Sequence, residues 1–420
     1  MKSYGNLISP SPASSHRVMM ASPPAHSIAG APAAQPDLPD EIVEEIFVRL
    51  DAAEDLARAS AACTTFRRIV SARRFLRRYR SLHAPPLLGV IAADLGKFYP
   101  AEPPHRSAPA GRAVARAADF TFSFLPKPNL WRTRDVRDGR VILSASASSA
   151  SLEGLVLVVC DPLHRRYVEI PPIPGDLVAC VRHLDSLEME FEPFLAPPNE
   201  EENESSSFRV ICNVMSAKEV VTFIFSSATK QWRHVTGIIL THGGVDATAS
   251  PRLFVRHYAH NCFYWMHPYN KNLLALDMGE MKFSFIGLPP KIIRLGPPLH
   301  VLKYAIVELG ESRLGFLTLG HSYYGLGLEL YLRDSGADAQ EWRHSKTIPM
   351  PNYNGCHIVA ATEGYVLILQ AVSSLYFTGP QYFTLELKTM QIERMCSMYS
   401  RSLHHKLYAN FPPPLSPPSI

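Results

Sequence analysis

The stretch GLVLVVCDPLHRRYVEIPPIP, residues 154–174, sets the pattern for most of this chain. It opens with a run of branched apolar residues, turns at a basic pair, and continues into a second apolar segment that carries Tyr167 and ends in Pro-Pro. Runs rich in Val, Leu and Ile that are bounded by Asp, Pro and Gly are typical of β-strands. Residues 154–174 therefore predict two strands joined by a turn.

The same outline returns four more times, in residues 219–235, 261–290, 326–351 and 381–395. The position of Tyr167 is taken in turn by Trp232, Phe283, Trp342 and Ile392, in steps of 65, 51, 59 and 50 residues. A four-stranded propeller blade takes about 40–50 residues, so these steps suit blades with some long loops. We expect an all-β, propeller-like domain over residues 85–410. A β-sandwich is the alternative.

Length and composition set the frame around this domain. The chain has 420 residues, 46% of them hydrophobic, which is more than one core usually holds. The net charge of +4 is too small to indicate a nucleic-acid partner. Residues 1–36, rich in Ala, Ser and Pro, are expected to be a disordered leader, and residues 411–420 a Pro-rich disordered tail.

Compartment and membrane association are judged from two further features. The seven cysteines form no Cys-x-x-Cys pair and no secretory signal precedes them, so we expect an intracellular protein, cytoplasmic or nuclear. The longest uncharged run, 364–385, contains Gly379-Pro380 and divides into two strands around a turn. No membrane span is expected.

No motif of a standard catalytic, metal or cofactor site is present. Phosphate-binding loops, His-Glu-x-x-His and nucleophile elbows are missing. His257 and His260 would point to opposite faces of a strand, and Cys262 brings no fourth ligand with it, so we predict no metal site. Aromatic residues in loop-like sequence are the candidates for contact with a target protein: Trp265, Tyr269, Tyr323 and Tyr324.

Residues 37–82 have a different pattern of apolar residues from the β domain, and this pattern predicts a helical module. Pro39 and the acidic pair after it fit a helix start. Apolar residues then recur at helical spacing in three short segments, and residues 67–80 carry seven arginines and no acid, which indicates a partly solvated helical connector. Three helices of this size cannot bury all their apolar faces among themselves, so some of that surface must meet a partner or the next domain.

The residues of this module resemble an F-box, the helical domain that docks onto the small Skp-type adaptor of cullin–RING ubiquitin ligases. The resemblance covers residues 37–75, from Leu38-Pro39 through the Arg49-Leu50 ending of the first helix to the third helical stretch, with Phe66 where the family usually has Trp. It implies an adaptor-binding set of Leu38, Pro39, Ile42, Val43, Ile46, Phe47, Leu50, Leu56, Cys63 and Phe66.

The β domain more loosely resembles the β-rich associated domains of the large plant F-box families, in phrases such as CDPLHRRYVEIPP. Together the two resemblances imply a non-enzymatic substrate receptor of a ubiquitin ligase, with a Skp-type adaptor, a target protein and no cofactor, nucleic acid or membrane. Two alternatives stay open. One is a glycan- or small-molecule-binding propeller without a ubiquitin role, with the aromatic segment 265–272 as its platform, and the other is an enzyme with a site in the propeller loops.

Overall fold

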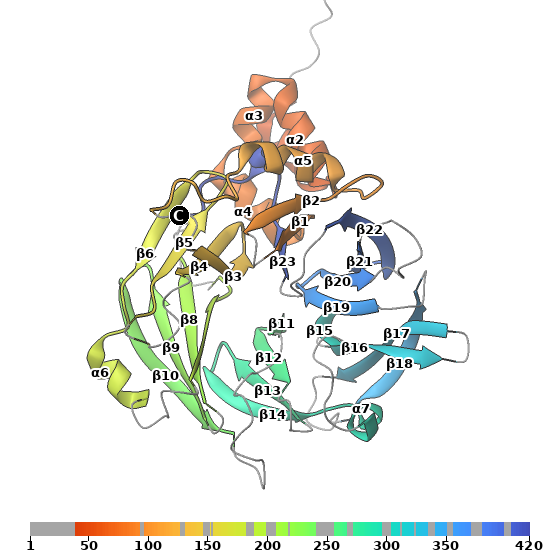
Figure 1. The fold of residues 1–420 in the computed structure, drawn as a ribbon. Coiled ribbons are helices and arrows are strands. Elements are labelled where there is room, and N and C mark those ends of the chain that lie inside the picture. The colour runs from red at the N-terminus through yellow and green to blue at the C-terminus, as the bar shows by residue number, and fades with distance from the viewer. Residues whose placement is uncertain are drawn as a thin grey trace, which may run out of the picture.

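The computed structural model describes residues 38–92, 96–126, 131–145, 152, 154–181, 189–198, 207–216, 219–240, 256–266, 272–295, 304–310, 313–322, 325–334, 341–350, 356–370, 380–398 and 405–420. They form a helical module followed by a β-propeller of six blades (Figure 1). The propeller prediction is confirmed, and the sandwich alternative is wrong. The expected leader, residues 1–36, lies outside the described residues.

Five blades are antiparallel four-stranded sheets whose strands follow chain order. Their strands are β3 (Trp131–Arg137), β4 (Arg140–Ala145), β5 (Leu157–Asp161) and β6 (Arg166–Ile170); β7 (Glu190–Leu195), β8 (Arg209–Met215), β9 (Glu219–Ser226) and β10 (Gln231–Ile239); β11 (His257–Ala259), β12 (Cys262–Met266), β13 (Asn272–Asp277) and β14 (Lys282–Gly287); β15 (Tyr304–Leu309), β16 (Arg313–Ser322), β17 (Gly325–Asp334) and β18 (Arg343–Pro349); and β19 (Cys356–Ala361), β20 (Tyr365–Gln370), β21 (Gln381–Glu386) and β22 (Gln391–Ser397). These are the five repeats that the sequence predicts.

The sixth blade joins the two ends of the β domain. It has three strands in the order β2 (Lys97–Pro100), β1 (Leu87–Ala92), β23 (His405–Ala409). Strand β23 also contacts β3 and β19, the first strands of the two neighbouring blades. Helix α5 (Ala108–Ala117) packs on β1 and β2 of this three-stranded sheet. Each of the other five sheets has a fourth strand. The ring therefore closes by pairing residues more than 300 positions apart in the chain.

Burial explains the strand pattern. Middle strands such as β5 and β9 are almost wholly buried between blades, whereas outer strands such as β6 and β18 are largely exposed. Two of the repeated aromatic residues also bind the preceding blade. The Nε1–H of Trp232 donates to the Pro171 carbonyl at 2.7 Å, and that of Trp342 donates to the Gly287 carbonyl at 2.6 Å. A buried indole needs such an acceptor, and here it joins neighbouring blades.

The module consists of four helices: three short helices and a fourth formed by the arginine-rich segment, the expected helical connector. They are α1 (Asp40–Val48), α2 (Ala53–Ala62), α3 (Thr64–Val70) and α4 (Arg73–Leu82). The arginine-rich segment is helical, as predicted, and it buries Phe75, Leu76 and Tyr79 in the module core. Burial and nearby carboxylates raise the pKa of Tyr79 to about 12, so the hydroxyl keeps its proton and donates it to the Leu50 carbonyl at 2.9 Å.

Opposite charges that are separated in the sequence meet in the module. Arg68 binds Asp40 at 2.6 Å, Arg74 binds Glu44 at 2.9 Å, and Arg78 binds Glu45. The hydrogen bond from Arg78 lowers the pKa of Glu45. The acidic residues at the start of the module are therefore paired with the basic residues at its end, and these ion pairs link α1 to α3 and α4.

Residues 411–420 differ from the disordered tail that their proline content predicts. Phe411 and Leu415 are buried in the core of the module, and Leu415 belongs to a short 3-10 turn, Pro413–Leu415. Ser419 binds Asp161 through its backbone N–H at 2.9 Å and its hydroxyl at 2.8 Å. Ile420 packs against the core of the blades β3–β6 and β7–β10. This C-terminal segment thus ties the module to the propeller.

Candidate functional site

Helix α1 carries apolar residues on two opposite faces. Val43, Phe47 and Val48 are buried in the module core. Leu38, Ile42 and Ile46 are 56%, 48% and 48% exposed, and they follow one another at intervals of four residues. That spacing places Ile42 and Ile46 one above the other along α1, and Leu38 lies two residues before the first residue of the helix, Asp40. We call these three side chains the α1 strip. Large apolar side chains grouped on a surface in this way mark an interaction site more often than scattered ones do.

The structure divides the ten residues of the implied adaptor-binding set into three groups. Leu38, Pro39, Ile42, Ile46 and Cys63 are exposed; Leu50 and Phe66 are partly buried against the module core; Val43, Phe47 and Leu56 are buried. The last three serve packing, and the prediction that they face a partner does not fit their burial. Helical spacing alone could not separate the two faces, because both carry branched or aromatic residues.

Trp265 is the one candidate target-contacting aromatic residue that lies within the described chain, and it is buried. Its exposure is 0%, and its Nε1–H donates to Glu192 Oε2 at 2.9 Å. Glu192 and Asp135 in turn bind Arg256, at 2.6 and 2.7 Å. Trp265 therefore belongs to the propeller interior, because it lies within strand β12 and not in a loop. Tyr269, Tyr323 and Tyr324 lie outside the described residues.

The residues considered as metal ligands in the sequence lie near the start of the blade β11–β14. Across the ranges that the structure describes, no group of three or more His, Cys, Asp or Glu side chains could hold a metal ion. His257 is buried on β11 with neither ring nitrogen hydrogen-bonded to a described residue, while His260 lies in the turn before β12 and contacts the Arg313 carbonyl at 2.9 Å. Within the same ranges, no helix has the length and apolar character needed to cross a membrane.

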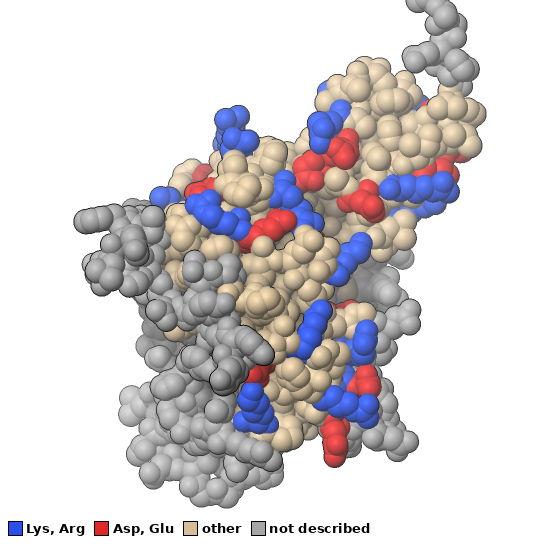
Figure 2. Space-filling model, turned by 90° about the vertical axis from the view of Figure 1, so that its right-hand side faces the viewer, with Lys and Arg blue, Asp and Glu red and all other residues tan. Residues whose placement is uncertain are grey.

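A cleft separates the module from one face of the propeller. Its volume is about 1410 Å³. The module contributes residues 51–55, Arg58, Tyr79, Leu82 and His83, and the propeller contributes turns that follow the first strands of several blades, with His260, Gly310 and Gly364 among them. Figure 2 shows acidic and basic side chains close together at the junction of the two parts. Sequence reasoning missed this site, because its walls come from turns that share no motif.

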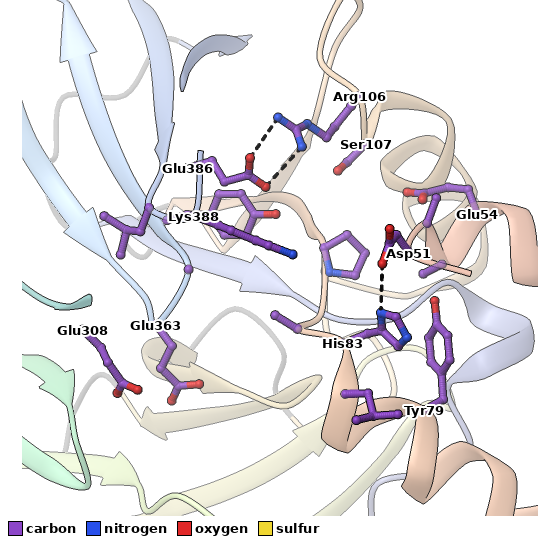
Figure 3. Close-up of a pocket in the computed structure, with 18 of the residues that line it drawn as sticks. Asp51, Glu54, Tyr79, His83, Arg106, Ser107, Glu308, Glu363, Glu386 and Lys388 are labelled. Carbon is purple, nitrogen blue, oxygen red and sulfur yellow. Dashed lines mark hydrogen bonds and ion pairs between the residues drawn. The ribbon is translucent and has the colours of Figure 1, made fainter. Parts of the chain in front are cut away.

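Half of the residues that line the cleft are charged or aromatic. Asp51 and Glu54 lie on the module wall and Glu308 and Glu363 on the propeller wall (Figure 3). The backbone N–H of His260 donates to Glu308 at 2.8 Å. His83 shapes the base of the module wall, because its Nε2–H donates to the Val48 carbonyl at 2.7 Å and its ring stacks on Tyr79. These two contacts fix the end of α4 within the module, beside the cleft.

The helical module corresponds to a known family. A family model described as F-box-like matches residues 35–82. These residues form an F-box-like domain. The match spans all four module helices, α4 included, so the arginine-rich segment belongs to the F-box-like domain itself. No curated protein matches the chain.

Solved structures resemble the propeller only distantly. A polysaccharide lyase of family PL25, an ulvan lyase, is 9% identical with a TM-score of 0.37, and the match covers 61% of this chain and 64% of the lyase. An oligogalacturonate lyase in complex with manganese is 8% identical with a TM-score of 0.33, covering 63% of each chain. The WD40 domain of SCAP from fission yeast is 7% identical with a TM-score of 0.28, covering 62% of this chain and 74% of that domain.

This chain therefore spans somewhat under two thirds of the length of the two lyases. Prolyl endopeptidases and the tricorn protease also appear among the similar structures. Identities and TM-scores of this size carry no information about activity, so the F-box-like match remains the finding that bears on function.

Proposed function

We propose that this protein is a substrate receptor of an SCF-type (Skp–cullin–F-box) ubiquitin ligase. The F-box-like domain binds a Skp-type adaptor, and the propeller holds a target protein. The observation that supports this most directly is the α1 strip, three exposed apolar residues on and just before the first helix of a domain that matches the F-box-like model. In this proposal the protein acts inside the cell and contributes no catalytic residue of its own.

The chemistry of such a receptor is positional. Binding the adaptor and the target on one chain raises the local concentration of target near the ubiquitin-carrying enzyme, which increases the rate without any reaction step in the receptor. The C-terminal segment supports this role, because Phe411 and Leu415 anchor the module while Ser419 anchors a blade. A firm joint between the two parts limits the positions that a bound target can take.

The α1 strip supplies the anchors of the adaptor interface in this proposal. A few well-packed apolar residues usually dominate the affinity of a protein interface. Leu38, Ile42 and Ile46 are about half exposed, so an adaptor can cover them without unfolding any part of the module. The ion pairs of Asp40, Glu44 and Glu45 with arginines hold α1 in place beside the strip.

Co-expression with a Skp-type adaptor, followed by size-exclusion chromatography, tests the proposal. Ile46→Lys removes one anchor and places a charge in the interface, so we expect at least about a 30-fold loss of affinity. Ile239→Lys is the matched control, because Ile239 is 64% exposed on β10 of the propeller. Co-elution of wild type and Ile239→Lys, but not of Ile46→Lys, supports the proposal. Absence of a complex with the wild-type chain contradicts it.

The glycan-binding alternative loses its main argument. It rested on the aromatic segment 265–272 as a platform. Trp265 of that segment is fully buried, and Tyr269 lies outside the described residues.

A further inference from the structure

We propose that the cleft between the F-box-like module and the propeller binds a target segment that carries lysine or arginine residues, while the α1 strip remains free for the adaptor. This inference rests on the proposed function, since it names the class of target and the place where the target is held. It is carried by the size of the cleft, by the origin of its two walls and by the balance of its charges.

The size of the cleft favours a polypeptide segment over a small molecule. Pockets for small ligands usually have volumes of about 300–1,000 Å³. This cleft has about 1410 Å³ and is lined by charged residues, tyrosines and prolines, including Tyr258, Tyr365, Pro197 and Pro198. An extended chain can lie along such a surface, with its aliphatic stems against the aromatic and proline rings and its charged ends on the rim.

The charges of the cleft favour a basic segment. Six carboxylates line it, against three Lys or Arg residues, which gives 3 − 6 = −3; they are Asp51, Glu54, Asp55, Glu308, Glu363 and Glu386 against Arg58, Arg106 and Lys388. Arg58 is paired with Asp55 inside the cleft, and Arg106 with Glu386. Within the described part of the chain, Asp51, Glu54 and Glu308 form no ion pair with Lys or Arg.

These three carboxylates lie on both walls, Asp51 and Glu54 on the module and Glu308 on the propeller (Figure 3). Asp51 lies 4.0 Å from His83 Nδ1, and Glu308 lies 3.7 Å from His260 Nδ1. A segment with two or more spaced basic side chains can therefore contact both parts of the protein at once. Asp51 and Glu308 have side chains 96% and 42% exposed, so they can reach a partner without rearrangement of the backbone.

Adaptor and target segment do not compete for the same residues. Leu38, Ile42 and Ile46 do not line the cleft, and the module wall comes from α2, α4 and the turn before α2. A segment in the cleft would thus lie against the same rigid module that carries the adaptor, which keeps the target close to the ligase.

Fluorescence anisotropy on the full chain tests this inference with three labelled decapeptides, (Lys-Ser)5, (Gln-Ser)5 and (Glu-Ser)5. We expect measurable binding of the lysine peptide only, with an affinity that falls as the salt concentration rises above about 0.1 M. Binding of all three peptides alike, or of none, overturns the inference.

Two sets of variants locate the binding. The double variant Glu54→Gln and Glu308→Gln removes one charge from each wall, and the amide oxygen introduced at 308 can still accept the His260 N–H. We expect about fivefold weaker binding of the lysine peptide. The matched control, Glu169→Gln with Glu280→Gln, removes two exposed carboxylates outside the cleft and should bind as the wild type does.

The opposite change keeps the test decisive if the double variant folds poorly. Lys388→Glu makes the cleft more acidic at an exposed turn residue and should tighten binding about threefold, whereas Lys282→Glu on β14 should leave it unchanged. Wild-type affinity in Lys388→Glu overturns the inference. Ile46→Lys should bind the lysine peptide as the wild type does, although it should lose the adaptor. A wild-type chain that binds the lysine peptide but no adaptor would count against the proposed function and not against the cleft.

Discussion

The F-box-like module and the β-propeller place their apolar residues differently. The module leaves Leu38, Ile42 and Ile46 exposed on and just before α1, although Val43, Phe47 and Val48 of the same helix are buried. The propeller buries Trp265, its most conspicuous candidate for contact with a target. Among its described residues, the exposed large apolar side chains are Val156, Tyr167 and Val168 in the blade β3–β6 and Ile239 on β10. Apolar residues that a complete fold leaves grouped on the surface thus indicate a partner better than aromatic residues that are dense in the sequence.

The largest expected effect comes from the buried aromatic residue. Trp265→Ala should lower the free energy of unfolding of the propeller by about 3–5 kcal/mol, because it leaves a cavity and removes the hydrogen bond to Glu192. Tyr167→Ala, at a 39% exposed position on β6, should change it by less than about 0.5 kcal/mol. Denaturant unfolding followed by circular dichroism measures both. Equal effects would mean that Trp265 does not belong to the core.

A smaller effect is expected where the two parts share a core. Leu415→Ala should lower the stability of the module by about 2–4 kcal/mol, since Leu415 is fully buried among module residues although it follows the propeller in the chain. Hydrogen exchange of α2 and α4 measures the change. Faster exchange in those helices, with unchanged exchange in the propeller strands, would show that the C-terminal segment is part of the core of the module. Unchanged exchange would contradict the packing of Leu415.

The smallest effect concerns His257, a buried histidine of the propeller that stays uncharged, in contrast to the solvent-exposed ion pairs of the module. Burial, with help from Arg256 and Lys406, lowers the pKa of His257 to about 3. The unfolded chain takes up this proton near pH 6.5 and the folded chain does not, so stability falls as the pH drops from about 6.5 towards 3.

Between pH 6 and pH 5 this single histidine should contribute a loss of about 1 kcal/mol. His257→Gln should therefore show a shallower decline in stability over that interval, whatever its stability at pH 7. Urea unfolding at several pH values measures the slope. A slope equal to that of the wild type would contradict the depressed pKa.

Much of the fold could be predicted from local sequence, and the reasons for the failures are physical. The repeated positions of Tyr167, Trp232, Phe283, Trp342 and Ile392 all fall on or beside the outer strands of the five complete blades. The sixth blade has no such repeat, because β23 pairs with β1 from the other end of the domain. Local patterns carry no information about a partner so far away in the chain.

The candidate sites show the same limit. Helical spacing identified α1, but only the packed structure separates buried Val43 and Phe47 from exposed Ile42 and Ile46. Proline content suggested a disordered tail, yet Phe411 and Leu415 find a core that the segment itself does not contain. The cleft could not be predicted at all, since its residues come together only after the ring has closed.

The order of synthesis gives the C-terminal segment a further consequence. The F-box-like helices leave the ribosome before the propeller does. Strand β23, which closes the ring, and part of the core of the module, Phe411 and Leu415, are translated after the five four-stranded blades. At about 5–20 residues per second, the module waits roughly 20–60 s for these residues. A chain that stops short of them would carry an incomplete ring and an incompletely packed module, and both would be open to chaperones and proteases.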